Sequence, residues 1–270
     1  MKKAASTAAQ KAVALADYNS RNDVERAPSE RWVTMNNALT RAGHGLTLSE
    51  KRIVALAISK LDSRRIPADL LRPPVTKVTA AEYVELFGVN PDTAYDQLKS
   101  AAKQLYDRSI AFFEPAHKRR GRPLKQAKTT MRWVGQATYH EGEGWIELHW
   151  WTELLPYLTG LQKQFTSYQL QQTTALRSIY SWRLLELLTH FEATGWAEYS
   201  VEDFRASMEA PPSLSDFGQL KRRIIEPAVK ELVQKDGWLI EWQPIKAGRR
   251  VRAIRFDFKR DPQQALFPAA

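Results

Sequence analysis

The sequence predicts an α+β protein, mainly helical, made of two tandem winged-helix domains that are related by an internal repeat. Residues 79–83 (T-A-A-E-Y) match residues 200–204 (S-V-E-D-F), and residues 95–99 (Y-D-Q-L-K) match residues 217–221 (F-G-Q-L-K) at nearly the same offset. Each half reads as a helix, a capped helix, a turn, a longer helix and a hairpin. This order is that of a helix-turn-helix with a β-hairpin wing.

The size and charge of the chain agree with two nucleic-acid-binding domains. A chain of 270 residues is long for one hydrophobic core, and 43% hydrophobic residues suffice for two. Lys and Arg total 40 against 30 Asp and Glu, a net charge of +10 that favours a polyanionic partner, nucleic acid before membrane. The alternative is a basic protein whose excess charge serves no particular partner.

The ends of the chain and its cysteine content indicate a cytoplasmic protein. Gln10 and Lys11 interrupt what would be the apolar centre of a signal peptide, and no apolar run approaches the roughly 20 residues that span a bilayer. The chain has no cysteine, so it can form neither a disulfide nor a thiolate metal site. We expect a flexible tail at 1–28, an N-terminal winged helix at 29–160, a C-terminal winged helix at 161–260, and a tail at 261–270.

In the first half, Ser49 is the expected cap of a helix that buries Ile53 and Leu56. Thr79 is expected to cap a short helix that Gly88 ends, and Asn90 begins the next helix. The inward positions of that third helix are expected to be Tyr95, Leu98, Ala102 and Leu105. Strands are predicted at 110–113, 131–139 and 145–151, the last two joined by a turn at 141–144.

In the second half, we predict a short strand at 165–170 and a helix at 178–190. The apolar side of this helix is expected to carry Ile179, Trp182, Leu185, Leu188 and Phe191. Ser200 caps the next helix, and a hairpin follows at 238–243 and 250–258 around Gly248. The tryptophan-rich strand 145–151 of the first half has two interpretations. Core packing is favoured, and the alternative is a dimer interface along the sheet edge.

The helix of residues 215–234 is the centre of the prediction, with Ser215 or Asp216 as its cap. Apolar residues at steps of three and four, from Phe217 to Leu232, share one face. The opposite face carries donors that suit phosphates and base edges. These are Ser215, Gln219, Arg222, Arg223 and Lys230. Lys221 lies nearer the apolar stripe and is expected to extend toward a phosphate, and Pro227 is expected to bend the helix. The alternative is a solvated basic face.

Three further segments are candidate DNA contacts. The C-terminal wing carries Lys246, Arg249, Arg250 and Arg252, which a flexible surface turn would also explain. The outward face of the first half's third helix carries Thr93, Gln97, Ser100 and Lys103, a weakly basic set. The loop expected to be the first domain's wing carries Lys118, Arg119, Arg120, Arg122 and Lys125. Its R-G-R-P core looks like an AT-hook, which lies in narrow A·T-rich minor grooves, and the alternative is a simple basic loop.

Enzyme classes find little support in the residues. The five histidines are scattered without metal-ligand spacing, and there is no G-x-x-x-x-G-K-[ST] phosphate loop. We therefore predict neither a metal nor another cofactor, and no catalytic residue. A nickase or primase remains the alternative from the enzyme class.

Three stretches in order resemble the replication initiator (Rep) proteins of iteron-containing bacterial plasmids. They are N-A-L and L-T-L-S-E-K-R-I at 37–53, L-R-S-I-Y-S-W-R-L-L-E-L-L at 176–188 and F-G-Q-L-K-R-R-I-I-E-P-A-V-K-E-L at 217–232. The resemblance implies tandem winged helices, of which the second makes the dominant DNA contacts.

The resemblance also implies partners and a mode of action. A monomer would bind directly repeated origin sites (iterons) in double-stranded DNA. A homodimer joined through the N-terminal domain would bind an inverted repeat and repress the protein's own gene. The host initiator and the replicative helicase would be protein partners. A transcriptional repressor with the same fold is the alternative within DNA binding.

Overall fold

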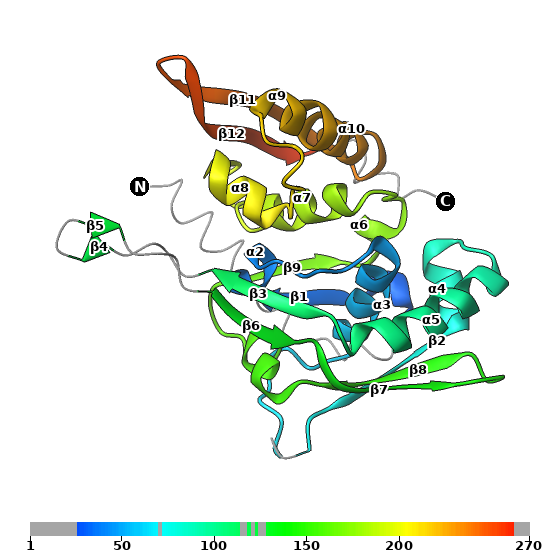
Figure 1. Cartoon of the computed structure of the whole chain (residues 1–270). Helices are drawn as coiled ribbons and strands as arrows, with labels where there is room; N and C mark the ends of the chain where they lie inside the picture. Colours follow the sequence, from blue (N-terminus) through cyan, green and yellow to red (C-terminus); the bar gives the residue numbers. More distant parts are fainter. Residues whose placement is uncertain (1–25, 70–71, 114–117, 120–121, 124–127, 262–270) are drawn as a thin grey trace, which may run out of the picture.

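The computed structural model describes residues 26–69, 72–113, 118–119, 122–123 and 128–261. The two halves lie on either side of a central layer that contains the β1–β9 strand pair and the helix α7 (Figure 1). The repeated elements of the first half are β1 (Trp32–Asn36), α2 (Asn37–Arg41), α3 (Leu48–Ile58), β2 (Val75–Thr79), α4 (Ala80–Phe87), α5 (Pro91–Leu105), β7 (Val134–His140) and β8 (Trp145–Trp150).

The second half presents the same elements in the same order. They are β9 (Phe165–Gln169), α6 (Gln171–Thr174), α7 (Ile179–Thr189), β10 (Trp196–Ser200), α8 (Val201–Ser207), α9 (Phe217–Leu220), a π turn (Lys221–Ile225), α10 (Glu226–Lys235), β11 (Trp238–Ala247) and β12 (Arg250–Arg260). The two main sheets also match, with strand order β2-β8-β7 in one and β10-β12-β11 in the other. The winged-helix fold and its internal repeat are therefore confirmed.

The remaining elements belong to the first half. Two 3-10 helices span Pro28–Glu30 and Thr152–Tyr157. Between α5 and β7 lie β3 (Ser109–Phe113), β4 (Lys118–Arg119), β5 (Arg122–Pro123) and β6 (Lys128–Arg132). The predicted strand 131–139 is in fact two strands in different sheets, because Trp133 is fully buried between β6 and β7 and donates its Nε1 hydrogen to His44 O at 3.1 Å.

The β1–β9 pair joins the two halves through equivalent strands. The strands are antiparallel, with Trp32 opposite Gln169 and Asn36 opposite Phe165. Thr34 faces Ser167 at the centre of this pairing, and their hydroxyl oxygens are 2.8 Å apart. The register is therefore symmetric about Thr34 and Ser167, so a local pseudo-two-fold axis passes between them.

Helix starts in the two halves use the expected chemistry, with one correction. The Thr79 hydroxyl accepts from Glu82 N at 3.2 Å, and the Ser200 hydroxyl accepts from Asp203 N at 3.0 Å, so equivalent residues cap α4 and α8. The prediction of Ser49 as the cap of α3 is wrong. Thr47 caps this helix in a reciprocal capping box with Glu50. The Thr47 hydroxyl accepts from the Glu50 amide, and the Glu50 carboxylate accepts from the Thr47 amide.

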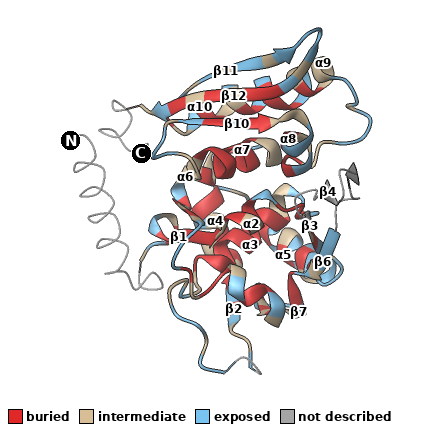
Figure 2. Cartoon of the chain, turned by 90° about the vertical axis from the view of Figure 1, so that its left-hand side faces the viewer, coloured by how far each residue is buried: buried red, intermediate tan, exposed pale blue. Residues whose placement is uncertain are grey.

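One further prediction about a helix face is wrong. In α5 the buried residues are Ala94, Leu98, Ala101 and Leu105. Tyr95 is 40% exposed and Ala102 only half-buried, so the inward face is rotated from the one predicted. The predicted apolar side of the helix 178–190 is confirmed at Trp182, Leu185 and Leu188. Burial extends further round this helix, because residues 181–188 are all buried between the two halves (Figure 2). Ser178 does cap this helix, by accepting from Tyr180 N.

A polar network fills the space between the halves. Lys51 of α3 and Glu186 of α7 form a buried ion pair, with Nζ and Oε1 2.7 Å apart. Tyr168 donates to the same Glu186 oxygen at 2.8 Å, and the Nδ1 atom of His44 lies 3.3 Å from Lys51 Nζ. Burial, followed by the nearby Lys51 charge, lowers the pKa of His44 well below its usual value. The imidazole is therefore neutral and accepts from the lysine.

Candidate nucleic-acid interface

The predicted recognition helix exists, but it is not a uniform α-helix. Asp216 caps it by accepting from Gln219 N at 2.9 Å, so Asp216 rather than Ser215 is the cap. After α9, the Glu226 amide donates to Lys221 O, five residues earlier, and α10 then runs on through Pro227. The proline expected to bend the helix is therefore accommodated by a π turn immediately before it.

The apolar face of this helix is confirmed, and its burial leaves the opposite side chains exposed to solvent. Leu220, Ile224, Ile225, Ala228 and Leu232 are buried. The polar side then presents three cations to solvent and leaves Gln219 half-buried. The exposed cations are Arg222, Arg223 and Lys230, and Ser215 is exposed just before the cap.

Lys221 occupies an intermediate position. Its Nζ atom lies 3.4 Å from Glu226 Oε1 and 5.7 Å from the centre of the Trp242 ring, and the side chain is 44% exposed. The ammonium is thus held toward β11 rather than extended freely. A regular helical pattern does not predict the contact with Glu226, because residues five apart are not neighbours on an α-helix. The contact with Trp242 depends on how the helix packs against β11.

The C-terminal wing is the extended end of the β11–β12 hairpin (Figure 1). Gly248, with φ of 62°, makes the turn, and a residue with a Cβ would be strained in this left-handed conformation. The four cations expected here are all exposed. They are Lys246, Arg249, Arg250 and Arg252. Arg252 lies 4.0 Å from Glu198, a contact that solvent screens.

The wing of the first half is not the segment that the sequence indicated. In the sheet order β2-β8-β7, the hairpin equivalent to β11–β12 is β7–β8, whose turn is residues 141–144. That turn is acidic, not basic. Glu141 pairs with Lys99 of α5 at 2.5 Å, and Glu143 accepts from Trp145 Nε1 at 2.6 Å. The hydrogen bond from Lys99 lowers the pKa of Glu141, which stays ionised.

The basic loop is instead an additional ribbon between β3 and β6. Its small strands β4 and β5 pair antiparallel, with Arg119 opposite Arg122, and they lie away from the body of the molecule (Figure 1). Arg120 and Lys125 lie outside the described residues. A ribbon inserted between α5 and β7 is a different element from a wing, so the internal repeat does not account for it.

The outward face of α5 is partly confirmed. Thr93, Ser100 and Lys103 are exposed, and the Ser100 hydroxyl accepts from Gln104 Nε2 at 3.2 Å. Gln97 is half-buried because its Oε1 accepts from the Tyr83 hydroxyl at 2.5 Å, which anchors it to α4. Gln97 is therefore less free to contact a ligand than the sequence suggested.

The tryptophan-rich strand divides between core and surface. Trp150 is buried and donates to Thr76 Oγ1 at 2.7 Å, which agrees with core packing. Trp145 is half-buried with the Lys77 ammonium 4.0 Å from its ring centre, and Trp151 is 38% exposed. The alternative of a dimer interface along the edge of this strand is wrong, because β8 pairs with β2 on one side and with β7 on the other and so has no free edge.

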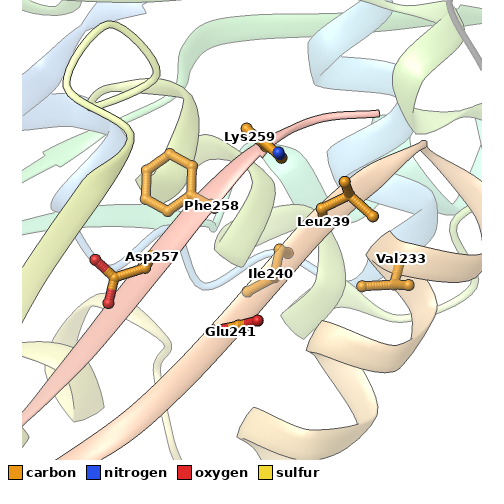
Figure 3. A pocket seen from close by; sticks show the side chains of 7 residues that line it. All are labelled: Val233, Leu239, Ile240, Glu241, Asp257, Phe258 and Lys259. Carbon is orange, nitrogen blue, oxygen red and sulfur yellow. The ribbon is translucent and has the colours of Figure 1, made fainter. Parts of the chain in front are cut away.

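A hollow of about 420 Å³ lies on the C-terminal half, where the end of α10 meets β11 and β12 (Figure 3). Its lining combines apolar side chains with Glu241, Asp257 and Lys259. Two carboxylates against one ammonium disfavour a phosphate ligand. In the described part of the chain, acidic residues and histidines form no group of three or more that could hold a metal ion. Within the same residues, no helix is both long and apolar enough to cross a membrane.

Family models match most of the chain. The model described as "Initiator Replication protein, WH1" matches residues 32–189, and "Initiator Rep protein, WH2" matches residues 200–258. The first match begins at β1 and ends with α7, and the second runs from the cap of α8 to β12. Together they cover both winged helices.

Individual relatives are more distant. An Escherichia coli "Replication initiation protein" is 23% identical over 243 residues, which cover 88% of this chain and 72% of that protein. An Escherichia coli "Uncharacterized 27.6 kDa protein" is 25% identical over 231 residues, covering 82% of this chain and 93% of that protein. The crystal structure of Pi initiator protein in complex with iteron DNA matches with a TM-score of 0.71 at 20% identity, covering 87% of this chain and 99% of that chain. At this identity the match shows a shared fold.

Proposed function

The chain belongs to the initiator replication protein family, and we propose that it is a plasmid replication initiator that recognises repeated origin sequences. The observation that carries the proposal is the exposed pair Arg222 and Arg223 on a helix whose other face is locked into the core. A guanidinium can donate two hydrogen bonds to one guanine in the major groove. The wing cations supply phosphate contacts beside it.

We propose that the second winged helix makes the dominant DNA contacts. Its candidates are Ser215, Gln219, Lys221, Arg222, Arg223 and Lys230 on the helix, and Lys246, Arg249, Arg250 and Arg252 on the wing. The first half, which we take as residues 29–160, contributes less. Its α5 offers Thr93, Ser100 and Lys103 and a constrained Gln97, and the neighbouring Glu141 and Glu143 repel phosphate.

The β4–β5 ribbon is proposed as a separate contact to A·T-rich DNA. A narrow A·T minor groove concentrates negative potential and attracts arginine, which suits the R-G-R-P sequence. The test replaces both Arg120 and Arg122 with Ala and measures origin binding and origin opening. Unchanged binding and opening would leave the ribbon as a simple basic loop.

Initiation itself is proposed to use binding energy without catalysis. A monomer bound to direct repeats would bend and open the origin, and the host initiator and replicative helicase would do the ATP-dependent work. A homodimer joined through the N-terminal half would bind an inverted repeat and repress the protein's own gene. This activity belongs in the cytoplasm, where plasmid DNA is copied.

A replication assay tests the proposal directly. A plasmid without another origin, carrying only this gene and its flanking DNA, is expected to replicate. The same plasmid with Arg222→Ala and Arg223→Ala is expected to fail while the protein still accumulates. If the wild-type plasmid fails although the protein binds its flanking DNA and silences its promoter, the chain is a repressor. Nicking of supercoiled plasmid with Mg²⁺ present would instead reveal an enzyme.

A further inference from the structure

The π turn in the recognition helix has a local cause. In a regular α-helix the ring of Pro227 would clash with the Arg223 carbonyl, and that carbonyl would have no amide donor at position 227. The chain instead widens the turn from Lys221 to Ile225, so that the Glu226 amide bonds to Lys221 O. The helix then resumes as α10 with Pro227 near its first position, where a missing amide costs little.

The wider turn creates a contact that an α-helix does not allow. Residues five apart on an α-helix point about 140° away from each other at roughly 100° per residue. Here Lys221 and Glu226, five residues apart, form an ion pair with their charged atoms 3.4 Å apart. Lys221 also lies over the Trp242 ring of β11. The side chain of Lys221 therefore contacts both the helix, at Glu226, and the sheet, at Trp242, and these contacts stabilise the turn.

The same turn sets how the polar side of the helix is presented. Two consecutive residues, Ile224 and Ile225, are buried, and the two before them, Arg222 and Arg223, are exposed. Residues in a π turn advance by a smaller angle than residues in an α-helix. The turn therefore rotates α9, which carries Gln219, relative to α10 compared with an unbroken α-helix. The direction in which Gln219 and the two arginines point depends on the turn being wide.

We infer that Pro227 determines DNA sequence specificity without touching a base, by maintaining the π turn that orients Gln219, Arg222 and Arg223. Glu226 supports this role through its ion pair with Lys221. Both are positioning residues. This inference rests on the proposed function, because it assumes that the helix reads DNA.

The test compares Pro227→Ala with Pro212→Ala, which replaces an exposed proline of the loop before the helix. The wild-type protein first selects its preferred sequence from a library of duplexes with a randomised core. Affinities are then measured for the selected duplex and for a scrambled duplex of equal length. A disturbed arginine fork loses about 1–3 kcal/mol of discrimination, which is roughly five- to 150-fold.

For Pro227→Ala we expect the ratio of the two affinities to fall by about tenfold or more. The affinity for the scrambled duplex and its salt dependence should stay unchanged, because the phosphate-binding cations remain. Pro212→Ala should keep the wild-type ratio. A wild-type ratio in Pro227→Ala would overturn the inference.

Glu226→Gln provides the second variant, in case Pro227→Ala does not fold. It removes the partner of Lys221 and should lower the specificity ratio in the same direction by a smaller factor, with Glu202→Gln of α8 as the control. If Glu226→Gln and Glu202→Gln had the same specificity ratio, the result would count against the inference. A wild-type protein that selects no sequence would instead contradict the proposed function, so the two failures are distinguishable.

Discussion

Arg52 and Arg183 are each the fifth residue of equivalent helices, and each donates to a backbone carbonyl of the opposite half. Arg52 Nη2 of α3 bonds to Leu176 O at 2.9 Å, and Arg183 Nη2 of α7 bonds to Ala42 O at 2.6 Å. Leu176 and Ala42 lie in the segments that precede α7 and α3 respectively. The exchange follows the same pseudo-two-fold relation that places Thr34 opposite Ser167. Two winged helices thus share one interface made of equivalent residues.

Replacing Arg183 with Met should destabilise the whole protein. The guanidinium also pairs with Glu209 at 3.0 Å and donates to Ser207 O, and it is only 1% exposed. Its removal leaves Glu209 Oε2 and two carbonyls without this donor, although Glu209 Oε1 still accepts from Gly45 N, and we expect a cost of about 3–5 kcal/mol. The free energy of unfolding from urea titration measures the loss.

Substitutions of two other arginines provide comparisons for the loss in the free energy of unfolding. Arg52→Met removes one carbonyl bond and a cation–π contact with Phe87, so a smaller loss is expected. Arg252→Met alters an exposed side chain and should change the free energy of unfolding by less than about 0.5 kcal/mol. If Arg183→Met were no less stable than Arg252→Met, the cross-domain exchange would contribute nothing to stability.

The repeat, the winged-helix fold and the basic face of the recognition helix could be predicted because each leaves a periodic or capping signal. The equivalence of Thr79 and Ser200 is an example, since both hydroxyls do cap helices. The acidic first wing could not be predicted. Composition marks a basic loop clearly, whereas the position of the β7–β8 turn depends on strand pairing across the sheet.

Details within the candidate site escaped prediction for a similar reason. The π turn changes which residues are neighbours, so a regular helical wheel could not associate Lys221 with Glu226. Gln97 looks outward on the same kind of wheel, but the hydroxyl of Tyr83 holds it. In each case a contact between elements, or a local change in helix geometry, overrides the periodic pattern.

Removing cations from the C-terminal wing should weaken binding to every DNA sequence alike. Lys246→Ala combined with Arg249→Ala removes two exposed charges beside the Gly248 turn. Each lost phosphate contact makes the slope of log affinity against log salt less steep by about 0.9, so a change of about 2 is expected. Fluorescence anisotropy across a salt series measures the slope. The pair Lys163→Ala and Lys259→Ala, also exposed, should leave it unchanged, and equal slopes for both pairs would place the wing off the DNA.

Reversing the charge of the first wing should strengthen DNA binding. Glu141→Lys with Glu143→Lys turns two repelling groups into cations and releases Lys99 from its ion pair. Affinity should rise and the salt slope should steepen by about 0.9 for each new phosphate contact. Glu85→Lys with Glu202→Lys makes the same change in net charge at exposed sites of α4 and α8. An equal gain in both double variants would reflect net charge alone and would show that this wing lies far from the duplex.

Stability should depend on pH through Asp236, at the end of α10. Burial, opposed by Arg260, raises the pKa of this carboxyl from 3.8 to about 6. The folded state holds the proton of Asp236 more tightly than the unfolded state does. The contribution of this protonation to the free energy of unfolding is therefore complete below about pH 3.8 and is lost as the pH rises through about 6. Relative to Asp236→Asn, the free energy of unfolding of the wild-type protein should therefore fall by on the order of 3 kcal/mol as the pH rises between these limits, at 1.36 kcal/mol per pKa unit.

Urea titrations of the wild-type protein and Asp236→Asn over this pH range measure the difference. Asp257→Asn is the matched control, because its hydrogen bond from Arg255 lowers the pKa of Asp257. A lowered pKa gives stability that is present at neutral pH and lost on acidification, so the control should show the opposite trend. A pH profile of Asp236→Asn that runs parallel to that of the wild-type protein would mean that the pKa of Asp236 is the same in the folded and unfolded states, because the Arg260 ion pair fully offsets burial.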